Sequence, residues 1–302
     1  MNGKLREKRK KKKIRKNNNR KEHTAMIHLI LDSTSGVSDD FLEQHANVHR
    51  IPLTIELGDE YVPENKATIR AVIERSETTK KSVPTSQPST GDFLKMFAEI
   101  PAEDPIIMLC LCSTISGTYN GALLAARQSG RKNITVVNTK TTAIGMIHLV
   151  LDGLEMIEKG MSYEEVSQAL LDASERTGLT VSLDTLDYIQ RGGRIGRAAG
   201  MIGSILKIKP VIYLNKNNEV DALAKVRTSK KANAAMLKYL EERAPFRRLG
   251  VVHIENEEGG KVLQALVQEQ YPDVEVTFTT ATPVLAAYLG PGLTGVIFEC
   301  AK

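Results

Sequence analysis

Two short runs of hydroxyl side chains are the residues of this chain best suited to chemistry. One is Pro84-Thr85-Ser86-Gln87-Pro88-Ser89 and the other is Ser113-Thr114-Ile115-Ser116-Gly117-Thr118. Each run is expected where a helix begins, and there the unpaired backbone N–H groups and the helix dipole favour a negative charge. Neither run contains a His, Lys or acid that would make a hydroxyl nucleophilic. The pattern therefore predicts a site that holds an oxyanion. Its candidate donors are Thr85, Ser86, Ser113, Ser116 and Thr118, together with backbone amides such as that of Gly117.

Two alternatives for these hydroxyls stay open at this point. Each hydroxyl could cap only its own helix, since Ser and Thr are favoured at that position. Ser116 could also act as a nucleophile if the fold brought a base beside it, which would make the protein a small-molecule serine hydrolase or phosphatase. The chain contains no G-x-S-x-G nucleophile elbow, which argues against that class.

Other chemistry has little support in the sequence. Neither a G-x-G-x-x-G fingerprint nor a Walker loop occurs, so no nucleotide cofactor is expected. His45 and His49 are four residues apart, but no third ligand accompanies them, so no metal is expected. The run from Gly192 to Gly196 predicts a tight turn, which either serves only as a turn or presents three arginines together. These are Arg191, Arg194 and Arg197.

The composition predicts a folded body with an aliphatic core. The chain has 302 residues, of which 41% are apolar and none is Trp. Three cysteines are too few for a disulfide framework, and Cys110 and Cys112 lie in an apolar run that is typical of a buried strand. Because no apolar run is long enough to span a bilayer and no signal peptide is evident, a cytoplasmic location is expected.

Positive charge is concentrated at the N-terminus. Residues 1–22 carry twelve Lys and Arg against two Glu, a net charge of +10, and since the whole chain has +5, the remainder carries −5. Residues 1–23 are therefore predicted to be a disordered tail, which is either only solvated or attracted to anionic lipid or nucleic acid. Because residues 23–302 carry a net negative charge, they are not expected to bind nucleic acid specifically.

The first half of the chain alternates between predicted strands and helices. This order is typical of an α/β fold, with a mostly parallel sheet that has helices on both faces. The segments 32–36 and 113–118 directly follow strands, which places them at the carboxyl edge, where ligands bind in such folds. The expected strands are 26–31, 51–57, 106–112 and 134–137, and the expected helices are 68–77, 92–100, 118–128 and 143–159.

The second half mixes a predicted hairpin with helices, which indicates an α+β domain. The hairpin joins 209–215 to 220–226, and further strands are expected at 179–183, 249–254, 274–280 and 293–298. Helices are expected at 164–177, 198–206, 229–243, 261–271 and 283–289. The predicted division is a tail of residues 1–23, an α/β domain of 24–160 and an α+β domain of 161–302.

Five motifs together resemble the DegV family. Besides the two hydroxyl runs they are Asp32-Ser33-Thr34, Arg191-Gly192-Gly193-Arg194-Ile195 and Gly290-Pro291-Gly292, and the resemblance extends over about residues 26–299. It implies two domains with a long-chain fatty acid buried between them. It also implies a carrier rather than an enzyme, because some members present the bound fatty acid to an ATP-dependent kinase that makes acyl phosphate for phospholipid synthesis.

The resemblance also implies roles for individual residues. The carboxylate would be held by Thr85, Ser86, Ser113 and Ser116, and the kinase would dock on Arg194 and Arg227. Two positions depart from the family pattern. Cys112 stands where the family usually has Ser, and Tyr288 stands where it usually has His near the ligand carboxylate. A phenol still donates a hydrogen bond, but it does not exchange a proton near neutral pH as an imidazole does.

Overall fold

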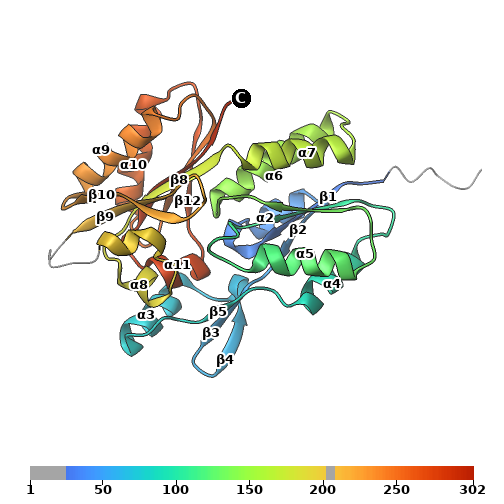
Figure 1. Cartoon of the computed structure of the whole chain (residues 1–302), viewed down its shortest axis with the longest axis horizontal. Coiled ribbons are helices and arrows are strands. Elements are labelled where there is room, and N and C mark those ends of the chain that lie inside the picture. Colours follow the sequence, from blue (N-terminus) through green and yellow to red (C-terminus); the bar gives the residue numbers. More distant parts are fainter. Residues whose placement is uncertain (1–24, 202–207) are drawn as a thin grey trace, which may run out of the picture.

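Four strands of the first half pair into a parallel sheet, in the order β2-β1-β6-β7. Its strands are β1 (His28–Asp32), β2 (Val48–Ile51), β6 (Ile106–Cys110) and β7 (Ile134–Asn138). The computed structural model describes residues 25–201 and 208–302, and the parallel sheet forms one of two lobes that lie side by side (Figure 1).

Helices cover both faces of the parallel sheet, as predicted. Successive side chains of a strand point to opposite faces, so Ile30 packs under one pair of helices and Leu29 and Leu31 pack under another. The first pair is α4 (Thr90–Glu99) and α5 (Thr118–Gln128), and the second is α6 (Ile144–Glu158) and α7 (Tyr163–Ser174). A short turn η1 (Ser33–Ser35) and helix α2 (Asp39–Gln44) lead from β1 to β2. The α/β fold class is confirmed.

The prediction of one strand over 51–57 is wrong. The chain leaves β2 at Ile51, and after Pro52 it enters a separate antiparallel sheet through β3 (Thr54–Leu57). Proline has no N–H to donate to a ladder, so it favours the end of a strand. This small sheet is completed by β4 (Glu60–Pro63) and β5 (Thr85–Ser86), with η2 (Glu64–Lys66) and helix α3 (Ile69–Thr79) between them.

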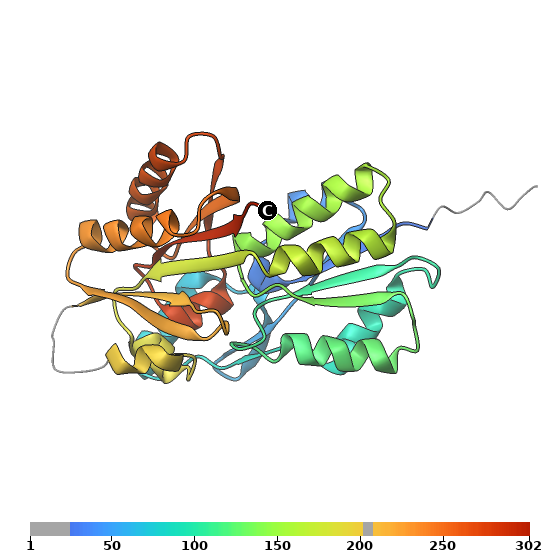
Figure 2. The ribbon, with the colours of Figure 1, turned by 45° about the horizontal axis from the view of Figure 1, so that its top comes forward.

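The second lobe is built on a six-stranded mixed sheet in the order β10-β9-β8-β13-β11-β12. Helices α9 (Ser229–Glu241) and α10 (Glu257–Gln270) pack against one face of it, as Figure 2 shows. Shorter helical elements lie elsewhere in this lobe: α8 (Asp187–Arg191), η3 (Gly196–Met201) and α11 (Pro283–Leu289). The strands are β8 (Thr177–Ser182), β9 (Lys209–Leu214), β10 (Val220–Val226), β11 (Phe246–His253), β12 (Val276–Thr280) and β13 (Thr294–Cys300).

Most elements predicted in the second half are confirmed. The predicted hairpin is present, since β9 and β10 pair antiparallel around Asn215 and Asn218. The helix expected over 198–206 is a 3-10 helix up to Met201, and the rest of that segment lies outside the described residues, as does the predicted tail. Ala198 and Met201 are buried in a core cluster, which matches a packing role.

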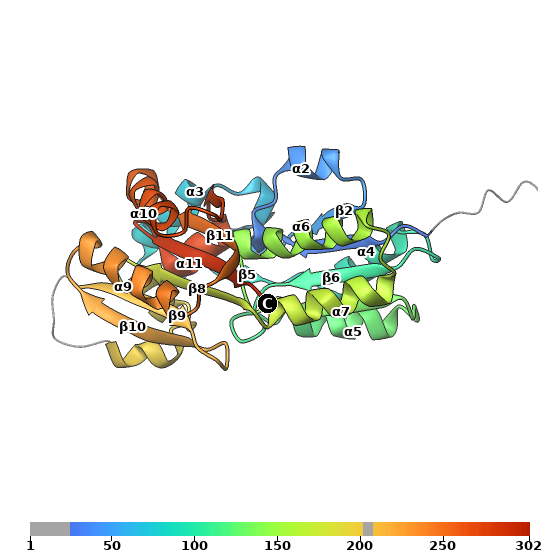
Figure 3. The same cartoon turned by 90° about the horizontal axis from the view of Figure 1, so that it is seen from above.

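The two lobes are in direct contact with each other. Helix α7 follows the predicted boundary at residue 160, yet Val166 and Leu170 pack into the core of the parallel sheet, and the Tyr163 hydroxyl lies 2.7 Å from the Thr135 hydroxyl. The boundary stays a prediction. Helix α6 lies against the mixed sheet as well, so it joins the two lobes (Figure 3).

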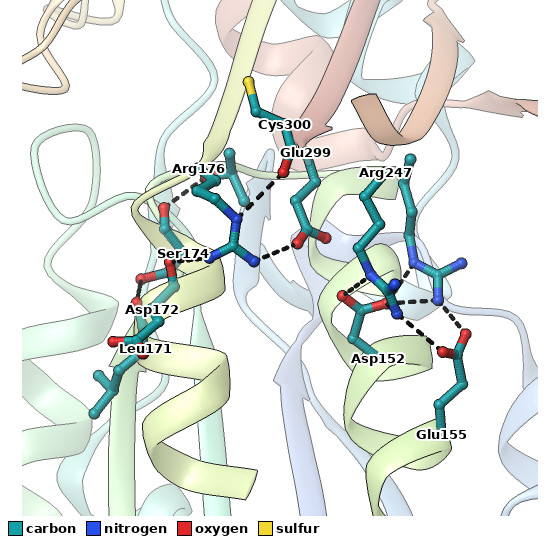
Figure 4. A network of polar contacts seen from close by, with 11 residues as sticks. Asp152, Glu155, Leu171, Asp172, Ser174, Arg176, Arg247, Glu299 and Cys300 are labelled. Carbon is teal, nitrogen blue, oxygen red and sulfur yellow. Dashed lines mark hydrogen bonds and ion pairs between the residues drawn. The ribbon is translucent and has the colours of Figure 1, made fainter. Parts of the chain in front are cut away.

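Ion pairs tie α6 to the mixed sheet beside this packing. The Asp152 carboxylate accepts hydrogen bonds from Arg247 at 2.9 and 3.0 Å and from Arg248 at 2.6 Å, and Glu155 contacts the same two arginines. Arg176 donates to Glu299 at 3.0 Å nearby (Figure 4). Among the residues described, no helix is long and apolar enough to cross a membrane.

Candidate functional site

A cavity of about 340 Å³ lies where the two lobes meet. Most of the cavity wall consists of aliphatic side chains from the mixed sheet and from α11. This volume is within the range of about 300–1,000 Å³ that is usual for small-molecule sites. The wall residues from the mixed sheet are Leu179, Val181, Ile212, Leu214, Val220, Val252 and Ile297.

Polar side chains line the cavity at one end and are linked to one another. The Thr85 hydroxyl lies 2.8 Å from the Tyr288 hydroxyl, and the Arg194 guanidinium lies 4.7 Å from the centre of the Tyr288 ring. Arg194 also donates to the Ile115 carbonyl oxygen at 3.3 Å, which brings it to the second hydroxyl run. The lining residues from the two hydroxyl runs and their neighbours are Thr85, Ser86, Gln87, Ser116, Gly117, Arg194 and Tyr288, and Thr142 is a further polar lining residue.

The two residues of the first hydroxyl run that were predicted to bind the ligand lie in a strand, and the end of the run caps a helix. Thr85 and Ser86 form β5, which pairs with β3, and α4 begins only at Thr90. The helix is capped by Ser89, whose side chain bonds the backbone of Asp92 in a capping box. The first run therefore does end at a helix start, as expected, but Ser89 caps that helix, whereas Thr85 and Ser86 lie in the preceding strand and line the cavity.

The second run also precedes a helix. Gly117 is the N-cap of α5 and has no side chain to cap the helix, and the Ser116 hydroxyl accepts a hydrogen bond from the Thr118 N–H at 3.2 Å. The Ser116 and Thr118 hydroxyls lie 2.9 Å apart, with Thr118 fully buried and Ser116 on the cavity wall. Thr118 thus contacts Ser116 but does not line the cavity.

Gln87 holds the two runs together. A Cβ on Gly117 would lie 2.1 Å from Gln87 Oε1, and one on Gly121 would lie 2.6 Å from Gln87 Nε2. These two glycines leave room for the Gln87 side chain to cross the start of α5. Gln87 was not among the predicted site residues, although its place inside the first hydroxyl run was a signal.

Ser113 lies outside the cavity. Its hydroxyl accepts a hydrogen bond from Asn138 at 2.8 Å, and it lines a neighbouring groove of about 700 Å³ that shares Ser116 and Arg194 with the cavity. Cys112 is fully buried, and its sulfur lies 3.1 Å from the Thr114 hydroxyl. Cys112 is not part of the cavity wall either, so its departure from the family pattern does not alter the polar end.

Two glycines make room for two tyrosine rings, Gly192 for Tyr288 and Gly290 for Tyr188. A Cβ on Gly192 would lie 2.3 Å from the Tyr288 ring, so the Gly-Gly turn makes room for the phenol. Gly290 has a φ of +70° and ends α11, and a Cβ there would strike the ring of Tyr188. Of the two arginines predicted for partner docking, Arg194 lines the cavity, whereas Arg227 is exposed and lies outside its wall.

The buried carboxyl group of Asp32 lies behind the cavity wall and bonds to a residue that lines it. Asp32 accepts hydrogen bonds from the Leu111 N–H at 2.7 Å and from the Thr34 hydroxyl at 2.6 Å, and Leu111 lines the cavity. Burial raises the pKa of Asp32 to about 7 against the opposing effect of these bonds. Within the part of the chain that is described, no three His, Cys, Asp or Glu side chains converge on a point where a metal ion could be held.

Comparison with known proteins identifies the family. The family model of DegV proteins matches residues 26–300. The chain belongs to the DegV family. A DegV domain-containing protein of Staphylococcus aureus strain COL is 30% identical over 277 residues, which cover 89% of this chain and 97% of the relative.

Solved DegV structures share the two-lobed fold. One is a DegV lipid-binding protein from Thermotoga maritima, with a TM-score of 0.81, 28% identity and coverage of 92% of this chain and 99% of the other. Another is a DegV family protein from Thermus thermophilus, described by its fatty acid binding, with a TM-score of 0.82, 28% identity and coverage of 91% and 100%. The DegV fold of this chain thus places an aliphatic cavity with a hydroxyl-lined end between its lobes.

Proposed function

We propose that this chain binds a long-chain fatty acid in the cavity between its lobes. The observation that carries the proposal is that Thr85, Ser116 and Tyr288 line one largely aliphatic cavity, in which the Thr85 hydroxyl lies 2.8 Å from the Tyr288 hydroxyl. A fatty acid has the matching chemistry, one carboxylate on a long apolar chain. Support also comes from the relative of Thermus thermophilus, whose description names fatty acid binding.

The carboxylate would accept hydrogen bonds at the polar end. Donors there are the hydroxyls of Thr85, Ser86, Ser116 and Tyr288 and the N–H of Gly117, with the Arg194 guanidinium at the rim. Hydrogen bonds to a charged group contribute about 1.5–3 kcal/mol each. Each buried CH₂ of the acyl chain adds about 0.8 kcal/mol, so the aliphatic wall supplies affinity and the hydroxyls set orientation.

Mass spectrometry of the native protein tests this proposal directly. We expect a mass increase of one fatty acid per chain, and the organic extract should contain the same acid. If the protein is empty and also fails to take up added oleate or palmitate, the proposal is wrong and a different anionic ligand must be sought.

The environment of Ser116 supports a carrier rather than a hydrolase. Its hydroxyl contacts the hydroxyl and the N–H of Thr118, at 2.9 and 3.2 Å, and neither group is a general base. A nucleophilic serine needs a base within hydrogen-bond reach. Covalent labelling of Ser116 by a fluorophosphonate probe would contradict the carrier assignment and favour the serine hydrolase.

We also propose that the carrier presents its fatty acid, in the cytoplasm, to a separate ATP-dependent fatty acid kinase. In that reaction a carboxylate oxygen attacks the γ-phosphorus of ATP, and ADP leaves. The polar end of the cavity is beside the groove that shares Ser116 and Arg194, which would give a kinase access to the carboxylate.

Arg227→Ala separates docking from lipid binding. Because Arg227 is exposed and lies outside the cavity wall, the variant should bind oleate within twofold of the unchanged protein. Kinase-dependent acyl phosphate formation should fall at least tenfold in an assay with a bacterial fatty acid kinase catalytic subunit. Arg127→Ala, an exposed arginine on α5, is the matched control and should leave both activities unchanged. Equal acyl phosphate formation by the two variants would contradict docking at Arg227.

For the basic tail we propose attraction to anionic bilayers. Its net charge of +10 favours this, since each basic residue near such a surface contributes about 1 kcal/mol. Removal of residues 1–23 should abolish co-sedimentation with vesicles that contain phosphatidylglycerol and leave oleate affinity unchanged. Co-sedimentation that resists both salt and removal of the tail would contradict the proposal.

A further inference from the structure

Glu64 is a buried acid that the sequence analysis did not single out. It is the first residue of η2, directly after β4, and only 2% of it is exposed. Acidic side chains are rarely buried to this extent unless they are paired or hydrogen-bonded. Its backbone is fixed as well, because the Glu64 N–H donates to the Leu53 carbonyl oxygen at 2.8 Å.

The Glu64 carboxylate joins three segments that are far apart in the sequence. Its Oε1 accepts a hydrogen bond from the Val284 N–H at 2.8 Å, and its Oε2 accepts one from the Ser33 hydroxyl. Ser33 in turn accepts from the Leu53 N–H at 2.8 Å. Leu53 and Val284 both line the cavity, so this carboxylate lies directly behind the wall.

Helix α11 depends on Glu64 for its N-terminal cap. The N-cap residue is Thr282, and its side chain makes no capping hydrogen bond. Pro283, the first helical residue, has no N–H, so Val284 supplies the first helical donor. A carboxylate at a helix N-terminus satisfies such a donor and interacts favourably with the helix dipole. Glu64 supplies it from a different part of the chain.

The same helix carries the phenol of the polar end. Tyr288 follows Val284 by four residues, which places the two side chains on one face of α11, one turn apart. Both line the cavity, and the Tyr288 hydroxyl lies 2.8 Å from the Thr85 hydroxyl. A shift of the start of α11 would therefore move the phenol relative to Thr85.

We propose that Glu64 is a positioning residue for ligand binding, which caps α11 and thereby holds the Tyr288 hydroxyl at the carboxylate end of the cavity. The inference rests on the proposed function, since it assigns Tyr288 to the ligand carboxylate. Glu64 itself does not contact the ligand, because it is not part of the cavity wall.

The charge state of Glu64 gives this role a pH signature. Burial raises the pKa of Glu64, while the hydrogen bonds from the Ser33 hydroxyl and the Val284 N–H and the charge of Arg50 act in the opposite direction. The Asp32 carboxyl, also buried, faces it from the end of β1 and interacts with it electrostatically. Above its pKa the carboxylate accepts hydrogen bonds from the Val284 N–H and the Ser33 hydroxyl. As the pH falls, a growing fraction of Glu64 is protonated, and this neutral form resembles the side chain of glutamine.

The test compares Glu64→Gln with the unchanged protein by oleate titration between pH 5 and pH 8. At pH 8 we expect about tenfold weaker binding, and the ratio of the two dissociation constants should shrink toward one as the pH falls. Taking this ratio at each pH removes the contribution of the titrating ligand carboxyl. Glu60→Gln, an exposed acid on β4, is the matched control and should bind as the unchanged protein does.

A second comparison, made in the Tyr288→Phe variant, tests whether Glu64 acts through Tyr288. In the Tyr288→Phe protein, Glu64→Gln should cost less than threefold in affinity, because the phenol it positions is already absent. If the cost stays tenfold there, or if the ratio is the same at every pH, the positioning role is wrong. If Glu64→Gln does not fold, Ser33→Ala, which removes the bond to Oε2, replaces it in both comparisons. An unchanged protein that binds no oleate would instead contradict the proposed function.

Discussion

The Thr85→Ala, Ser116→Ala double variant is expected to bind oleate at least 30-fold more weakly than the unchanged protein. Both hydroxyls line the polar end of the cavity, one from β5 and one from the turn before α5. A hydrogen bond to a charged group contributes about 1.5–3 kcal/mol, and about 1.4 kcal/mol corresponds to a tenfold change in affinity. Two such bonds would contribute about 3 kcal/mol or more, and partial compensation by Ser86 and Tyr288 reduces the expected loss to about 2 kcal/mol, which corresponds to about 30-fold. Isothermal titration with oleate measures it.

The control for this variant is a pair of hydroxyls away from the cavity. Thr78→Ala, Ser229→Ala changes two exposed side chains, on α3 and at the start of α9, and should leave the affinity unchanged. Circular dichroism should show the same fold for both double variants. If the Thr85, Ser116 variant binds oleate within threefold of the unchanged protein, the assignment of the carboxylate to this end of the cavity is wrong.

Asp152→Asn is expected to lower the free energy of unfolding by about 3 kcal/mol. Asp152 is 5% exposed and accepts hydrogen bonds from Arg247 and Arg248 across the junction of the lobes. Removal of one partner from a buried ion pair typically costs about 3–5 kcal/mol, but the Arg247 side chain is 43% exposed and Glu155 still contacts both arginines, which reduces the cost. Asparagine keeps the shape and one acceptor, so we expect the lower value. Urea unfolding followed by circular dichroism measures the change.

The same carboxylate predicts a direction for the pH dependence of stability. Burial alone would raise the pKa of Asp152, but the hydrogen bonds and charges of Arg247 and Arg248 outweigh it and hold this pKa below its usual value. A group whose pKa is lower in the folded state stabilises the fold above its unfolded pKa, and this contribution is lost as the pH falls. The difference in the free energy of unfolding between the unchanged protein and Asp152→Asn should therefore become smaller as the pH is lowered.

The control is Glu158→Gln, an exposed acid on the same helix, which should change the free energy of unfolding by less than about 0.5 kcal/mol. A loss below about 1 kcal/mol for Asp152→Asn would contradict the assigned role.

Local sequence patterns were sufficient to predict most of the helices and strands. The predicted bounds of α5 and α11 agree with the structure, since each helix combines an apolar face with a clear start and end signal. The strand expected over 51–57 is wrong because two strands of different sheets are separated by a single proline, and an apolar run does not reveal to which sheet each part belongs.

The candidate site was only partly accessible from local patterns. The hydroxyl runs are visible as residue types, but Thr85 and Tyr288 are 203 residues apart and meet only through the packing of α11 against the small sheet. Glu64 resembles any other acid after a strand, and its burial follows from three segments that enclose it. Ser113 belongs to the same run as Ser116, yet Asn138 holds it in the neighbouring groove.

The sequence by itself determined the α/β class, the alternation of elements, the hydroxyl runs and, through five motifs, the resemblance to the DegV family. These features depend on local periodicity, turn chemistry and residue type, which act over a few positions. Only the tertiary structure decided which hydroxyls share a cavity, that Arg194 lies at its rim while Arg227 does not, and that Glu64 caps α11. Such contacts depend on how distant segments pack against each other, because side chains separated by hundreds of residues meet only when the sheets and helices between them have their final arrangement.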